Sequence, residues 1–127
     1  METKPNRPTA VLYVHGMGGS PTESEHYRAL FPNCDIVGLN YQTFCPEETG
    51  IGLYWKDVVY IREKPYRWHV PTHILYGAAD RLIPYDAITT FADAHGADVT
   101  VLEDGKHWFH TDEQMAFLDG WIRSLQR

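Results

Sequence analysis

The feature that most limits the fold of this chain is a set of four short apolar runs. Each run is followed by a segment with helix signals. The runs cover residues 9–14, 35–41, 71–77 and 98–102, and each ends at a glycine or a polar loop. Such runs are typical of buried strands. Strands that alternate with helices predict a parallel sheet with helices on both faces. We therefore predict an α/β fold, with the 127 residues forming one domain.

Capping residues mark the expected helices. The first should start at Ser20, with Pro21 and Glu23 at the first and third helical positions as in a capping box, and end near Phe31. The others are expected over residues 47–64, over residues 84–95 with Gly96 just beyond, and after a Thr111 cap. The predicted order is therefore β-α-β-α-β-α-β-α.

Charge and hydropathy exclude several classes of protein. A net charge of −6 argues against a protein that binds along nucleic-acid phosphates. The longest clean apolar run, residues 10–14, is too short to span a bilayer. The start of the chain has no apolar signal region, so we expect a cytoplasmic protein. Cys34 and Cys45 make no disulfide framework, although a single bridge between them stays open.

Residues suited to chemistry follow all four expected strands. They are His15 with its glycines, Cys45, Asp80 and His107. Functional groups of parallel sheets lie on the loops at the carboxyl ends of strands. Asp80 and His107 are 27 residues apart, enough for one helix and one strand. We therefore expect adjacent loops to bring this pair into contact.

Three of these loops carry motifs. Residues 12–20 read LYVHGMGGS, residues 74–84 read ILYGAADRLIP, and residues 105–109 read GKHWF. In this order the motifs resemble those of the α/β-hydrolase superfamily, in particular small bacterial serine hydrolases. They cover the first third and the last half of the chain.

The resemblance implies a role for each motif. Residues 74–84 are similar to the segment that bears the family's acid, Asp80, and residues 105–109 to the loop that bears its catalytic histidine, His107. Residues 12–20 resemble the HG-type oxyanion loop, here His15, Gly16, Met17, Gly18 and Gly19. The implied lineage hydrolyses esters or other acyl compounds.

The chain departs from that family at the nucleophile. The family places it on a G-x-S-x-G elbow, whereas the serines here are Ser20, Ser24 and Ser124, none in such a motif. Thr72 follows Tyr41 by 31 residues, and one βαβ crossover uses roughly 30 residues. The elbow strand and its flanking helices are therefore missing, by natural loss or by engineering.

The shortened fold has two possible forms. The remaining strands could form a three-layer α/β/α sheet of about four strands in spatial order 2-1-3-4, with right-handed crossovers. Alternatively, two chains could pair along an exposed sheet edge or apolar face, giving a homodimer. Four tryptophans in so short a chain are consistent with a buried partner surface.

Two residues are candidates to replace the missing nucleophile. Ser20 lies beside the glycine turn, but a helix-capping hydroxyl is committed to backbone N–H groups. Cys45 lies on the loop after the second strand, where a thiol could attack if His107 reached it. The plain alternative for each is a cap and an inert loop thiol.

The sequence thus predicts a weak or inactive esterase-like domain acting on a small acyl or ester ligand. Its alternative is a non-catalytic module that binds a small ligand or dimerises. We expect no cofactor, no nucleic acid and no membrane partner. We also expect no metal, because zinc sites need three or four convergent ligands, and two histidines three apart in a loop, His107 and His110, are weak evidence for one even with Asp112 nearby.

Overall fold

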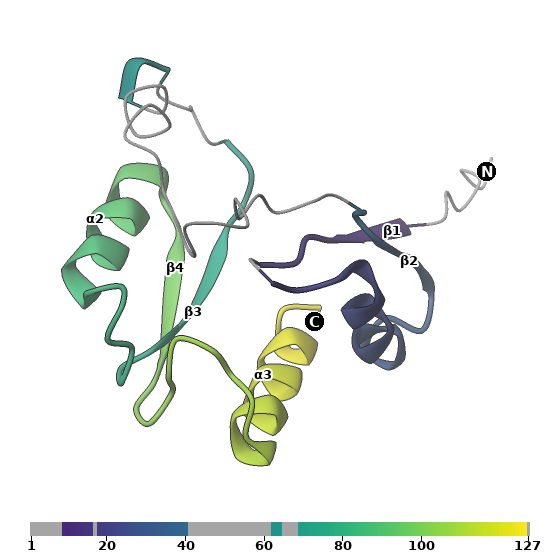
Figure 1. The fold of residues 1–127 in the computed structure, drawn as a ribbon. Coiled ribbons are helices and arrows are strands. Elements are labelled where there is room, and N and C mark those ends of the chain that lie inside the picture. The colour runs from purple at the N-terminus through teal and green to yellow at the C-terminus, as the bar shows by residue number, and fades with distance from the viewer. Residues whose placement is uncertain (1–8, 17, 41–61, 65–68, 127) are drawn as a thin grey trace, which may run out of the picture. The chain divides into compact units, whose positions relative to one another are not determined.

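The computed structural model describes residues 9–16, 18–40, 62–64 and 69–126. The chain divides into two compact units, Met1–Tyr54 and Trp55–Arg127. In chain order, the elements are β1 (Thr9–Tyr13), η1 (Pro21–Leu30), β2 (Cys34–Gly38), β3 (His73–Gly77), α2 (Tyr85–His95), β4 (Asp98–Leu102) and α3 (Asp112–Ser124) (Figure 1). Each unit contains one pair of parallel strands, so the predicted mixture of helices and parallel strands is confirmed.

The first unit packs η1 against the β1–β2 pair. Tyr27 of η1 stacks on Tyr13 of β1 with ring centroids 5.2 Å apart. As expected, Ser20 caps this segment, and its hydroxyl accepts a bond from the Thr22 N–H. The segment is a 3-10 helix, and Glu23 accepts a hydrogen bond from the Tyr13 hydroxyl at 2.8 Å. This carboxylate therefore links the helix to β1.

The opposite face of the β1–β2 pair is apolar and exposed. Leu12 and Val37 are register partners, and they are 60% and 52% exposed. Val14 and Leu39 are exposed as well. Parallel sheets are usually covered on both faces. Among the described residues of this unit, only the face under η1 carries a helix, in contrast to the two covered faces expected.

The second unit has a helix on each face of the β3–β4 pair. Tyr76 of β3 contacts the ring of Tyr85 in α2. Thr100 of β4 accepts a hydrogen bond from the indole of Trp121 in α3 at 3.1 Å. Thr100 lies opposite Leu75, the neighbour of Tyr76, so Thr100 and Tyr76 point to opposite faces. The two helices therefore enclose the strand pair.

The single four-stranded sheet expected from the sequence is corrected by these pairings. The described strands form two two-stranded sheets, β1–β2 and β3–β4, and no pairing joins β1 to β3 among them. Each pair that forms consists of strands consecutive in the chain and joined by one helical crossover, η1 or α2. Such neighbours pair most readily, because their connection is short.

The helix boundaries in the second unit follow the predicted caps. Gly96 ends α2 with a left-handed φ of 63°, and Pro84 is the residue before its first turn. Thr111 caps α3 and forms a capping box with Gln114. Of the helix expected over 47–64, only residues 62–64 are described, and 62 and 63 are helical. None of the described helices is long and apolar enough to cross a bilayer.

The end of β3 and the loop after β4 approach so closely that neither has room for a side chain. A Cβ on Gly77 would overlap the carbonyl group of Gly105, and a Cβ on Gly105 would lie 2.8 Å from the Gly77 Cα. Both neighbours are backbone, which cannot rotate away. Glycine at these two positions therefore permits the loop arrangement described below.

We predict that Gly77→Ala lowers the free energy of unfolding by about 1–3 kcal/mol, because the added methyl group overlaps backbone. Gly120→Ala is the matched control, since Gly120 lies in α3 with open space around it. It should be neutral or stabilising by about 0.5–1 kcal/mol. Urea unfolding followed by circular dichroism compares the two. Equal effects would contradict the proposed close approach.

Candidate functional site

Backbone hydrogen bonds join the loops that follow β3 and β4. The N–H of Ala78 donates to the carbonyl of Leu102, and the N–H of Ala79 donates to the carbonyl of Gly105, each at 2.9 Å. The two bonds extend the parallel pairing past the last residues of the strands. As a result, position 80 on one loop and position 107 on the other lie within side-chain reach.

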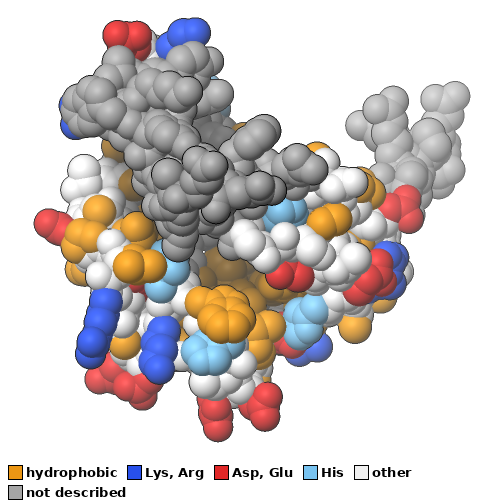
Figure 2. Space-filling model, viewed as in Figure 1, with side chains coloured by type: hydrophobic (Ala, Val, Ile, Leu, Met, Phe, Trp, Pro, Cys, Tyr) orange, Lys and Arg blue, Asp and Glu red, His pale blue; other side chains and the backbone are white. Residues whose placement is uncertain are grey.

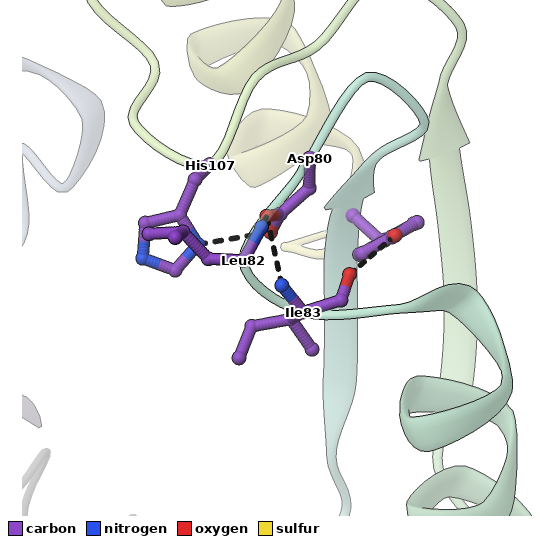
Figure 3. A network of polar contacts seen from close by, with 5 residues as sticks. Asp80, Leu82, Ile83 and His107 are labelled. Atoms are coloured by element: carbon purple, nitrogen blue, oxygen red, sulfur yellow. Dashed lines mark hydrogen bonds and ion pairs between the residues drawn. The ribbon is translucent and has the colours of Figure 1, made fainter.

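Asp80 and His107 form the contact expected from the sequence. The Nδ1–H of His107 donates to Oδ2 of Asp80 at 2.9 Å (Figure 3). The Asp80 side chain is only 6% exposed, whereas that of His107 is 51% exposed. With a proton on Nδ1, the basic lone pair of the neutral ring lies on Nε2. The geometry therefore presents an oriented base on a solvent-accessible ring.

The second oxygen of Asp80 is held by its own loop. Oδ1 accepts the backbone N–H groups of Leu82 at 2.7 Å and Ile83 at 3.0 Å (Figure 3). The carbonyl of Ile83 in turn accepts the Tyr76 hydroxyl at 2.7 Å. Burial raises the pKa of that hydroxyl, which therefore stays a donor. Asp80 thus connects the loop backbone to His107.

Opposing effects set the pKa of Asp80. Enclosure of the carboxyl raises its pKa, because burial disfavours the charged form. The hydrogen bonds from Ile83, His107 and Leu82, together with the attraction of the His107 ring, outweigh this effect. The net pKa is below its ordinary value, so Asp80 is a carboxylate at neutral pH.

Gln114 supports the histidine loop, a role that was not predicted from the sequence. Its buried side chain accepts the N–H of His110 at 3.1 Å and donates to the carbonyl of Asp104 at 3.3 Å. It therefore links both ends of the segment that contains His107. The available signal was the Thr111-x-x-Gln114 spacing of a capping box, with Gln114 as its third helical residue.

The glycine turn belongs to the first unit. His15 is buried, and its Nδ1–H donates to the carbonyl of Gly16 at 2.9 Å. Gly18 has a φ of +76°, and the N–H of Gly19 donates to the carbonyl of Gly16 at 3.0 Å. Met17 lies outside the described residues. The described part is thus a tight turn that needs glycine at position 18.

The remaining candidates are the two possible nucleophiles, Ser20 and Cys45, and the possible metal ligands around His110. The hydroxyl of Ser20 is engaged as a helix cap. Cys45 lies outside the described residues. His110 donates its Nδ1–H to the carbonyl of Trp108 at 2.8 Å. Among the residues that are described, no group of three or more metal-ligating side chains could hold an ion.

No protein-family model, curated protein or solved structure matches this chain. The resemblance to α/β-hydrolases therefore rests on the motifs of residues 12–20, 74–84 and 105–109 alone.

The lowered pKa of Asp80 predicts an acid-sensitive contribution to stability. When the pKa of a carboxyl is lower in the folded than in the unfolded protein, its ionisation stabilises the fold at pH values above the unfolded-state pKa. This stabilisation is lost as the pH falls through the folded-state pKa. Wild type should therefore be more stable than Asp80→Asn at neutral pH, and the difference should shrink in acid. Urea unfolding at neutral and acidic pH measures it.

Asp93→Asn is the control, because Asp93 is an exposed carboxylate on α2. Its effect on stability at neutral pH should be small. A difference between wild type and Asp80→Asn that is unchanged by acid would contradict the assigned pKa direction.

Proposed function

We propose that this protein is an α/β-hydrolase-like domain of an ester- or acyl-hydrolysing lineage in which His107 acts as a general base. The proposal rests on one observation: Asp80 is bonded to loop backbone through one oxygen and to His107 through the other. Such an orienting carboxylate fixes the tautomer of a catalytic histidine and stabilises the imidazolium that forms.

The reaction needs no covalent intermediate. The Nε2 atom of His107 takes a proton from water as the water oxygen attacks the ester carbonyl. The tetrahedral intermediate then collapses, the bond to the alcohol oxygen breaks, and the imidazolium returns the proton to that oxygen. The products are a carboxylic acid and an alcohol. Because no G-x-S-x-G serine is present, activity should be weak.

A second histidine–aspartate pair provides a comparison, because among the described residues its carboxylate contacts only the histidine. His73 and Asp98 face each other at the amino ends of β3 and β4, with Nδ1 and Oδ2 3.3 Å apart. The Asp98 side chain is 82% exposed. This pair is longer and more solvated than the Asp80–His107 pair, so its ring is less firmly oriented. His73 is therefore a matched control for catalysis by a surface imidazole.

The competing function is a non-catalytic module that binds a small acyl ligand or dimerises. It predicts ligand binding or self-association without turnover.

We predict that His107→Ala lowers hydrolysis of p-nitrophenyl acetate at least tenfold, because an oriented general base contributes about 10²–10⁴-fold. Asp80→Asn should reduce the rate in the same direction. His73→Ala should leave the rate unchanged. Initial rates followed by p-nitrophenolate absorbance at constant pH give the comparison.

A fluorophosphonate probe with intact-mass detection tests the mechanism separately. Attack by water predicts no covalent adduct on the folded protein. An adduct that disappears in His107→Ala would replace the water mechanism with a recruited nucleophile, Ser20 being the first residue to map. Equal rates for wild type, His107→Ala and His73→Ala would refute the general-base assignment and favour the binding module.

A further inference from the structure

Trp108, the residue after His107, is a large apolar side chain held in an exposed position. It is 72% exposed. Its indole stacks on the imidazole of His110, with ring centroids 4.6 Å apart and planes 21° apart. The Nδ1–H of His110 also donates to the Trp108 carbonyl at 2.8 Å. One face of the indole is therefore supported and the other is open to a ligand.

Leu82 is a second exposed hydrophobic residue and lies on the loop after β3. Its side chain is 71% exposed, although its backbone N–H is bonded to Asp80 at 2.7 Å. The same carboxylate therefore fixes the backbone of Leu82 and the ring of His107 (Figure 3). Hydrophobic side chains lie next to histidine side chains on the visible face of the molecule (Figure 2). The Leu82 backbone and the His107 ring are thus both bonded to Asp80, and Trp108 directly follows His107 in the chain.

We propose that Leu82 and Trp108 form the substrate-binding surface of this site and that they select esters bearing an uncharged aromatic group. The proposal rests on the function assigned to His107 above. An aromatic ring stacked on the open indole face buries apolar area on both partners and satisfies the preferred geometry of ring pairs. The flat shape of the indole therefore favours a ring over a branched chain.

Exposed charges of both signs lie close in the sequence to Trp108 and Leu82. The cations are Arg81 and Lys106, and the carboxylates are Glu103, Asp104, Asp112 and Glu113. This mixture does not favour one sign of charge on a ligand, whereas stacking of an uncharged ring on the indole needs no ionic partner.

The fixed position of Trp108 makes it suited to binding. A side chain that is already stacked on a ring that is itself hydrogen-bonded to backbone loses little freedom when a ligand arrives. Its support differs from that of an ordinary surface tryptophan, which is free to change rotamer. His110 is thus a positioning residue for the ligand surface.

Binding is tested first with amides that cannot turn over readily. N-benzylacetamide mimics benzyl acetate, and N-ethylacetamide mimics ethyl acetate without the ring. The protein is labelled with fluorotryptophan, and the Trp108 signal among the four tryptophans is assigned by its loss in Trp108→Phe. N-benzylacetamide should shift the Trp108 signal in a saturable way, whereas N-ethylacetamide should not. Leu82→Asn should weaken that binding roughly tenfold.

Rates test the same surface independently. The ratio of rate constants for benzyl acetate and ethyl acetate should fall roughly tenfold in Trp108→Ala, and Trp108→Phe should retain most of it. His107→Ala should abolish turnover of both esters but leave binding of N-benzylacetamide intact.

The outcomes separate the two proposals. Binding at Trp108 without turnover by wild type would overturn the assigned function and keep the ligand surface. Turnover with no preference for the benzyl ester would overturn the ligand surface and keep the base. A shift confined to other tryptophans, or equal shifts with both amides, would also overturn the ligand surface.

Discussion

The backbone hydrogen bonds between the loops after β3 and β4 are the constraint on which the candidate site depends. They fix the distance between the backbones of Asp80 and His107, independently of the side chains. The side-chain bonds then add direction, since Asp80 connects its own loop to the imidazole. Gln114 fixes the histidine loop from the opposite side. The relative position of Asp80 and His107 on two loops is thus determined by the pairing of the strands that precede them.

Much of the second unit could be predicted from the sequence, because its signals are local. Gly96 and Thr111 mark helix ends through backbone conformation and capping, which depend on few neighbouring residues. The contact of Asp80 with His107 followed from parallel topology alone, since consecutive strands present their following loops at one edge. The chemical roles of the pair remain predictions.

Other features depend on contacts that a sequence pattern does not reveal. The capping-box pattern of Ser20 and Glu23 indicated a helix, but Glu23 accepts the Tyr13 hydroxyl, a partner on a strand ten residues away. The 3-10 form of η1 has no sequence signal of its own. Whether four strands make one sheet or two depends on long-range pairing, which the local alternation of strands and helices leaves open. Gln114 likewise has a dual role that only its distant bond to Asp104 reveals.

The close approach of Gly77 and Gly105 also limits how this chain can diverge. A destabilising side chain in a core is often compensated by a smaller neighbour. Here the neighbour of each glycine is the backbone of the other, and no substitution shortens a backbone. A side chain at either position therefore cannot be compensated by a second substitution, whereas the surrounding surface residues can be replaced without this overlap. New specificities in this scaffold would arise from those surface residues, with the glycine crossing left intact.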